Sequence, residues 1–166
     1  MHTVISSVMI RLARRTRRAG SGIKGFMFRG PSVIRLNPSA RACNQACLMC
    51  DVRGVGSAAP ETSFPEDELS VDDQISIIRK APLSLDTVEI SGGGEPLIKK
   101  DIARLFPEIK KKGAKGVLIT NGSLLSDGIS TVLVSCGWDS VRVSMNAASK
   151  KNYLKVHGAD HFDIVV

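Results

Sequence analysis

The segment LDTVEISGGGEP, residues 85–96, indicates the fold most directly. Its first seven residues are rich in β-branched and apolar side chains, which favours a β-strand. Three glycines, a glutamate and a proline follow at once and are typical of a loop. In parallel α/β folds, ligands bind at the carboxyl ends of strands. The glycine-rich loop is therefore a candidate binding segment.

Helical patterns flank this strand on both sides. Before it, Ser70 precedes VDDQISIIRKA, whose apolar residues recur at helical spacing, and Asp73 stands where a capping box places its second member. After it, DIARLFPEIKKKG has an apolar face and ends at Gly113, which predicts a helix with a glycine cap. Pro107 inside that pattern predicts a helix that is bent or starts late.

The same patterns continue through the rest of the chain. Strands are expected at 32–37, 116–122 and 139–146, and helices at 124–135, 149–158 and from 161 onward. The element order is one strand followed by α-β-α-β-α-β-α. Such alternation with short connections predicts an α/β fold with a parallel sheet and right-handed crossovers.

The polar motifs all follow strands of this predicted sheet. They are Cys43 to Cys50, Gly92 to Glu95, Thr120 to Gly122 and Ser144 to Asn146. Because the carboxyl ends of parallel strands meet at one edge of the sheet, we expect these four segments to share one pocket.

The net charge of +7 in 166 residues is confined to the start of the chain. Residues 1–30 carry seven basic side chains and no acidic one, and the remaining 16 basic and 16 acidic side chains cancel. Apolar residues between Val4 and Leu12 recur at helical spacing, with arginines after them. This order is the reverse of a secretory signal. We expect a basic N-terminal extension, either a helix or an unstructured segment, with an anionic membrane surface or RNA as possible partners.

Composition favours a reducing compartment. No apolar run is long enough to cross a bilayer, so we expect no transmembrane segment. Four cysteines without an export signal are more typical of metal or redox sites than of disulfides. The expected location is the cytoplasm.

Three of these cysteines, Cys43, Cys47 and Cys50, lie within eight residues. Their spacing also fits one stripe of a helix. A straight helix would hold the first and last thiols about 10 Å apart along its axis, from a rise of about 1.5 Å per residue. If these thiols bind a metal, the segment must therefore be a curled loop.

Thiolates select zinc or iron–sulfur clusters. Zinc needs a fourth ligand, for which the sequence offers Cys136, His157 or His161. Cys136 lies at a predicted helix end and is expected to be a buried apolar side chain. An iron–sulfur cluster with three cysteines instead leaves one iron open, as catalytic metal sites do.

The spacing Cys43-x3-Cys47-x2-Cys50 after a first strand resembles the signature of radical S-adenosylmethionine (radical SAM) enzymes. The resemblance implies that these cysteines ligate a [4Fe–4S] cluster, and that the amino and carboxylate groups of S-adenosylmethionine chelate the fourth iron. One electron then cleaves the sulfonium to methionine and a 5′-deoxyadenosyl radical, which abstracts hydrogen from a substrate. An electron donor such as a flavodoxin or a ferredoxin is also implied.

Further motifs resemble the same family. The segment GGGEP matches the family's Gly-Gly-Glu segment, so Gly93, Gly94 and Glu95 are expected to hold the amino group of the cofactor's methionine. Ser144 and Asn146 stand where the family contacts the cofactor's ribose or carboxylate. The tripeptide TNG at 120–122 resembles a segment that shapes the pocket floor.

The resemblance covers residues 32–166 and departs from the family pattern in three respects. Met49 replaces a frequent aromatic residue, Asn146 lacks a carboxylate charge, and the chain stops after the fourth of six βα units. We therefore expect a partial (βα)6 TIM-like barrel, truncated after about four units, with an incomplete radical SAM core at 31–166. The loop 52–68 is expected to cover the cluster. The alternative is a non-catalytic zinc-binding module with a basic tail for RNA or another partner.

Overall fold

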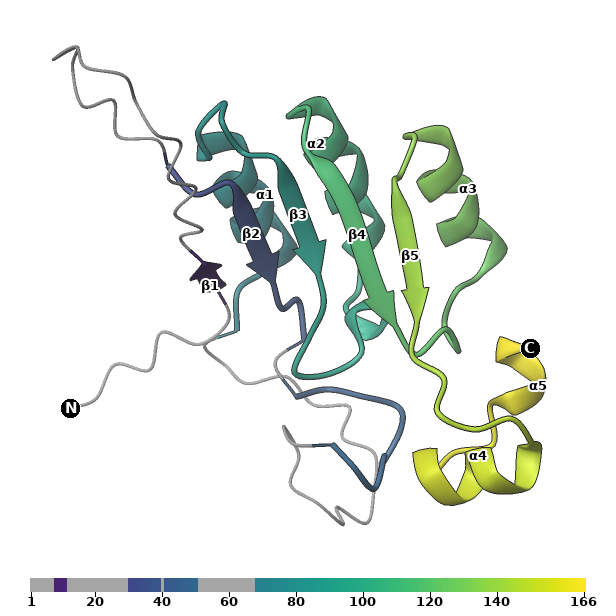
Figure 1. The fold of residues 1–166 in the computed structure, drawn as a ribbon. Coiled ribbons are helices and arrows are strands. Elements are labelled where there is room, and N and C mark those ends of the chain that lie inside the picture. Colours follow the sequence, from purple (N-terminus) through teal and green to yellow (C-terminus); the bar gives the residue numbers. More distant parts are fainter. Residues whose placement is uncertain (1–7, 12–29, 40, 51–67) are drawn as a thin grey trace, which may run out of the picture.

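The computed structural model describes residues 8–11, 30–39, 41–50 and 68–166. At its centre is a five-stranded sheet in the order β1-β2-β3-β4-β5 (Figure 1). The strands are β1 (Val8–Arg11), β2 (Val33–Leu36), β3 (Thr87–Ile90), β4 (Lys115–Thr120) and β5 (Ser140–Val143). Strands β2 to β5 pair in parallel, whereas β1 pairs antiparallel with β2. The predicted α/β fold with a parallel sheet is confirmed.

The helices occupy two regions. They are α1 (Val71–Lys80), the 3₁₀ turns η1 (Pro96–Ile98) and η2 (Ile102–Arg104), α2 (Leu105–Lys111), α3 (Asp127–Ser135), α4 (Lys150–His157) and α5 (Phe162–Val165). Helices α1, α2 and α3 lie along one face of the sheet, and α4 and α5 lie beyond the carboxyl ends of β4 and β5 (Figure 1). The second pair is therefore placed beside the predicted binding loops.

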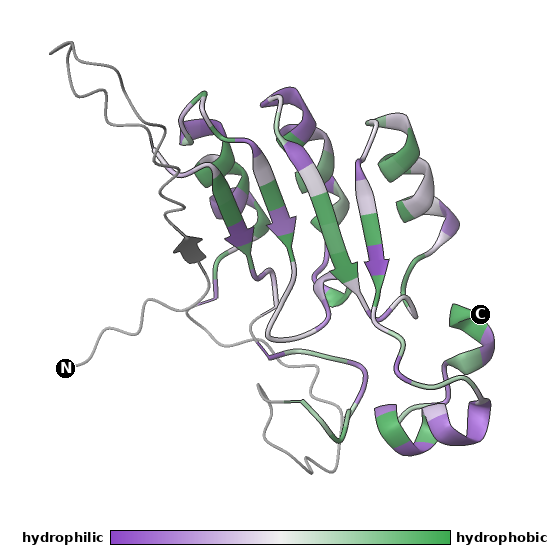
Figure 2. Cartoon of the chain, in the orientation of Figure 1, coloured by the Kyte–Doolittle hydropathy of each residue, from purple (hydrophilic) through white to green (hydrophobic). Residues whose placement is uncertain are grey.

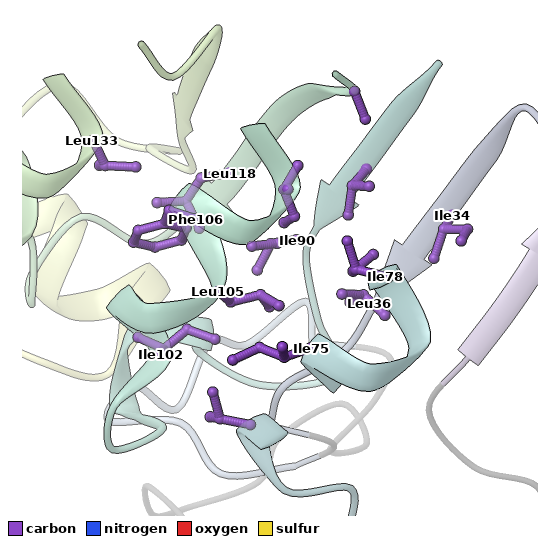
Figure 3. Close-up of a cluster of buried hydrophobic side chains, with 14 of the residues drawn as sticks. Ile34, Leu36, Ile75, Ile78, Ile90, Ile102, Leu105, Phe106, Leu118 and Leu133 are labelled. Carbon is purple, nitrogen blue, oxygen red and sulfur yellow. The ribbon is translucent and has the colours of Figure 1, made fainter. Parts of the chain in front are cut away.

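The hydrophobic core lies between the sheet and these three helices. Alternate residues of β2, β3 and β4 are buried, as a half-covered sheet requires, and Ile78 and Phe106 on the helices are fully buried against them (Figure 3). Hydrophobic residues predominate in β4, whereas α4 is mostly hydrophilic (Figure 2). On the other face of the sheet, Arg35 and Glu89 form an ion pair at 2.7 Å. One face of the sheet is therefore covered by the hydrophobic core, whereas the other carries charged side chains.

Local sequence signals explain where most helices begin and end. The capping box of Ser70 and Asp73 is present, with the Ser70 hydroxyl accepting a hydrogen bond from the Asp73 backbone. Pro107 does delay its helix, because the 3₁₀ turn η2 precedes α2. Gly113 adopts a φ of 80° just after α2, as expected of a terminating glycine. Helix α3 starts three residues later than predicted, since Ser126 caps it through the Ile129 backbone N–H.

The N-terminal extension differs from the helical pattern of its sequence. Residues Val8–Arg11 form β1 and add an antiparallel strand to the edge of β2. A strand at this position satisfies backbone groups of β2 that a helix would leave unpaired. Residues 1–7 and 12–29, and nearly all of the loop 52–68, lie outside the described residues. Within the described ranges, no helix has the length and apolar character needed to cross a membrane.

Candidate functional site

An open pocket of about 250 Å³ lies at the carboxyl ends of the parallel strands. All eight residues predicted to bind the cluster or S-adenosylmethionine line it: Cys43, Cys47, Cys50, Gly93, Gly94, Glu95, Ser144 and Asn146. Four segments that are far apart in the chain therefore meet in one place, as expected from the strand order. Ser144 and Asn146 are exposed at its rim. Their individual contacts with a cofactor remain predictions.

The cysteine segment is a loop and not a helix. Residues 41–50 contain no helical turn of the α type, and the backbone N–H of Cys50 donates to the Cys47 carbonyl at 3.1 Å, which curls the loop around its last two cysteines. All three cysteines are half-buried and free of disulfides. Partly exposed thiols at a pocket wall have the chemistry that a thiolate-ligated cluster requires. The described part of the chain holds no group of three or more ligating side chains already arranged for a single metal ion.

The glycine-rich loop fits against the cysteine loop through its backbone. Glu95 donates its N–H to the Ala42 carbonyl at 2.9 Å, and the Ser39 hydroxyl donates to the Glu95 carbonyl at 2.8 Å. A Cβ atom on Gly94 would lie 2.1 Å from the Ala42 carbonyl oxygen, which is far inside contact distance. Glycine at position 94 thus allows the two loops to approach each other.

We predict that Gly94→Ala separates these loops. The new methyl group must displace backbone atoms of Ala42, so we expect a stability loss of about 1–3 kcal/mol and a lower cluster content after reconstitution. Chemical denaturation and iron analysis measure the two effects. Gly128→Ala is the matched control, since a Cβ there lies 3.9 Å from its nearest neighbour on exposed α3. Equal behaviour of the two variants would contradict the prediction.

Glu95 is only 2% exposed and its carboxylate is held by the chain itself. Oε1 accepts hydrogen bonds from the Leu97 backbone at 3.0 Å and from the Thr120 hydroxyl at 2.6 Å. Oε2 accepts one from the Asn121 backbone at 2.7 Å. Burial raises the pKa of Glu95, and these three donors oppose that rise without cancelling it. The carboxylate therefore ties the end of β3 to the end of β4, a role that the sequence did not indicate.

A second set of hydrogen bonds joins the cysteine loop to the end of β4. The Asn121 amide donates to Asn44 Oδ1 at 2.9 Å, and the Asn44 amide donates to the Ser123 hydroxyl at 2.9 Å. Ser123 in turn donates to Asn121 Oδ1 at 2.7 Å, which closes the set. Asn44 lies between two predicted cluster ligands, so these bonds fix the start of the loop. The TNG tripeptide thus helps to build the pocket, as its position suggested.

The end of α4 fixes the other half of the cysteine loop. The backbone N–H groups of Ala46 and Leu48 donate to the carbonyls of His157 and Val156 at 3.0 and 2.9 Å. The next residue, Gly158, adopts a φ of 63°, and a Cβ there would lie 2.8 Å from the Ala46 carbonyl oxygen. The last carbonyls of a helix, which have no partner within it, are thus satisfied by the loop.

His157 faces the cysteines from this helix end and is 1% exposed. Its Nδ1 lies 3.3 Å from Cys47 Sγ, and its Nε2 accepts a hydrogen bond from the Asn146 backbone at 3.3 Å. Its ring stacks on Tyr153 with centroids 4.2 Å apart. Burial lowers the pKa of His157, which favours the neutral ring. The sequence offered His157 only as one of three possible zinc ligands.

The other two possible zinc ligands do not line the pocket. Cys136 ends α3, packs against the hydrophobic core, and donates from Sγ to the Leu133 carbonyl at 3.4 Å. Cys136 is half-buried and not fully buried as expected, and burial raises the pKa of its thiol. His161 precedes α5. The pocket therefore contains three of the four cysteines and one histidine.

Comparison with known proteins connects this pocket to a family. Residues 37–166 match the sequence model of the radical SAM superfamily. The chain is 31% identical over 133 residues to a probable GTP 3′,8-cyclase of Methanothermobacter thermautotrophicus, covering 80% of this chain and 41% of that protein. It is 23% identical over 125 residues to a probable GTP 3′,8-cyclase of Metallosphaera sedula, covering 75% of this chain and 37% of that protein.

A solved structure shows the same fold. SuiB of Streptococcus suis bound to S-adenosylmethionine superposes with a TM-score of 0.65 at 21% identity, over 81% of this chain and 29% of that one. The four-stranded parallel sheet accordingly corresponds to part of a radical SAM barrel. The chain spans about two fifths of the length of the two curated relatives. The match over residues 37–166 shows that this chain belongs to the radical SAM superfamily.

Proposed function

We propose that this chain binds a [4Fe–4S] cluster through Cys43, Cys47 and Cys50 and holds S-adenosylmethionine beside it for reductive cleavage. The observation that carries the proposal is that three half-buried cysteines and the glycine-rich loop after β3 line the same pocket. Superfamily membership supports both cofactors. When bound, the reduced cluster supplies the electron that cleaves the cofactor to methionine and a 5′-deoxyadenosyl radical.

The chain's own residues bind and orient the reactants. Gly93, Gly94 and Glu95 form the wall at which carbonyl oxygens can accept hydrogen bonds from the methionine amino group. The buried carboxylate of Glu95 accepts hydrogen bonds from Thr120 and Asn121 and so holds that wall against the end of β4. Ser144 and Asn146, which line the same pocket just after β5, are proposed to donate to the ribose or the carboxylate.

The proposed partners are an electron donor, such as a flavodoxin or a ferredoxin, and a substrate that supplies the hydrogen atom. The names of the relatives suggest nucleotide cyclisation as one direction for assays. We propose a cytoplasmic location, because reduced thiols and an exposed cluster need a reducing compartment. The basic extension at residues 1–30 is proposed to contact an anionic partner.

Anaerobic reconstitution with iron and sulfide tests the proposal. We expect about four iron and four sulfide per chain, an EPR signal after reduction, and a change in that signal when S-adenosylmethionine is added. Product analysis under reducing conditions should then detect methionine and 5′-deoxyadenosine. A reconstituted cluster whose EPR signal ignores S-adenosylmethionine would contradict cofactor binding.

Zinc binding is the second interpretation, and the position of His157 beside Cys47 is the observation that favours it. Its Nδ1 lies near Cys47, where a fourth zinc ligand would be needed. However, the Asn146 N–H points at Nε2, so the ring proton of the neutral histidine belongs on Nδ1. A protonated nitrogen donates to sulfur and cannot ligate zinc. Stoichiometric zinc without iron after anaerobic purification would favour this second interpretation over the first.

A further inference from the structure

We propose that His157 is a positioning residue that donates an N–H···S hydrogen bond to Cys47 and thereby raises the reduction potential of the cluster. The inference rests on the proposed function, because it requires Cys47 to be a cluster ligand. It starts from the 3.3 Å separation between Nδ1 and Cys47 Sγ. Sulfur is a larger acceptor than oxygen, so this distance is well within the range of a hydrogen bond.

The direction of the hydrogen bond follows from the other side of the ring. A backbone N–H is always a donor, so the N–H of Asn146 requires an acceptor at Nε2. The neutral imidazole then carries its proton on Nδ1 and donates it to Cys47. The Cys47 thiol has one proton, which it donates to Gln45 Oε1 at 3.6 Å, so toward Nδ1 the sulfur acts as the acceptor.

The ring is held at this angle by contacts that do not involve the sulfur. Tyr153 stacks against it from one turn earlier in α4, and the Tyr153 hydroxyl accepts a hydrogen bond from the Gln45 amide at 2.8 Å. All three side chains are at most 2% exposed. The main-chain bonds from Ala46 and Leu48 to the end of α4 fix the loop and the histidine to each other. The donor is therefore preorganised and does not depend on the metal.

The expected consequence is electrostatic. Reduction adds one negative charge to the cluster and its thiolates. A hydrogen bond to a ligating sulfur stabilises the more negative state, and such bonds are among the factors that set cluster potentials. Removing the donor should make the cluster harder to reduce. We expect a decrease of about tenfold in the reduction equilibrium constant, which is 59 mV for a one-electron couple.

The experiment measures the midpoint potential of the reconstituted cluster by EPR-monitored titration. His157→Asn keeps an N–H donor near the Nδ1 position, whereas His157→Gln places its amide near Nε2 and His157→Phe keeps only the ring. We expect the potential to fall in the Gln and Phe variants and to stay near the wild-type value in the Asn variant. Leu154→Ala is the control, since Leu154 lies in the same helix, is exposed and carries no charge, and the potential of this variant should be unchanged.

Iron and sulfide content distinguishes a failure of the proposed function from a failure of the proposed role of His157. A wild-type chain that assembles no [4Fe–4S] cluster overturns the proposed function itself. A wild-type cluster whose potential is unchanged in His157→Gln and His157→Phe overturns only the role of His157, as would equal shifts in all three His157 variants and Leu154→Ala. Cluster loss from the Gln and Phe variants with retention in the Asn variant supports the donor role, and cluster loss from all three overturns it.

Discussion

Replacing Cys43, Cys47 or Cys50 by alanine is expected to abolish assembly of the [4Fe–4S] cluster. The proposed site has three protein ligands, so each substitution leaves two thiolates for four iron atoms. Loss of residues that only support metal ligands typically lowers metal affinity by about 10–100-fold, so loss of a ligand should exceed about 100-fold. Iron and sulfide analysis after anaerobic reconstitution, together with the EPR signal of the reduced protein, measures the effect for each variant.

Cys136→Ala provides the matched control. Cys136 is the fourth cysteine of the chain, but it ends α3, packs against the core and does not line the pocket. Its replacement should leave the iron content at the wild-type level, with a stability cost of about 1 kcal/mol for the lost packing. Equal iron loss in Cys136→Ala and in the other three variants would show that removing any cysteine lowers the iron content. Cys43, Cys47 and Cys50 would then not form a specific cluster site. A Cys47→Ala protein that retains the full cluster would overturn the ligand assignment.

The parts of the site that depend on local signals could be predicted from the sequence. Strand and helix periods, the capping box at Ser70 and the glycine after α2 fix the order of the elements. A parallel sheet then brings the carboxyl ends of its strands to one edge, whatever the details of packing. The meeting of Cys43, Gly94 and Asn146 in one pocket follows from this topology alone.

The parts that depend on contacts between distant residues could not be predicted. Cys47 and His157 are separated by 110 positions, and Asn44 and Asn121 by 77. No local pattern distinguishes His157 from any other histidine near the end of a helix. Its stacking partner Tyr153, one turn earlier, becomes informative only once α4 is known to end against the cysteine loop. Strand β1 was missed for the same reason, because it forms by pairing with β2.

These contacts also fix the path of the cysteine loop. The cysteine loop is joined to the end of β3 through Ala42, to the end of β4 through Asn44 and to α4 through Ala46. Three separate elements therefore define its path. A change in any one of them should alter the cluster site while leaving the core between the sheet and α1, α2 and α3 intact.

Glu95→Ala is expected to give the largest loss of stability among substitutions at the pocket. It leaves the donors of Leu97, Thr120 and Asn121 without their carboxylate in a buried place. Each unsatisfied buried donor costs about 1–3 kcal/mol, so we expect a total of about 3–5 kcal/mol after partial relaxation. That is a large share of the stability of a typical domain. Urea denaturation measures it, and Asp72→Ala, which removes an exposed ion pair with Arg104, should have little effect.

Glu95→Gln separates the shape of this side chain from its charge. The amide oxygen can still accept from Leu97 and Thr120, but the amide nitrogen then faces the Asn121 N–H, so we expect a smaller loss than with alanine. The pH dependence gives a second test. Burial raises the pKa of Glu95 above its ordinary value of 4.5, so ionisation of the folded protein costs stability. The stability advantage of the wild type over Glu95→Gln is therefore full below pH 4.5 and declines as the pH rises through the raised pKa. An advantage that grows with pH over the same range would mean that the three hydrogen bonds outweigh burial and that the pKa is lowered.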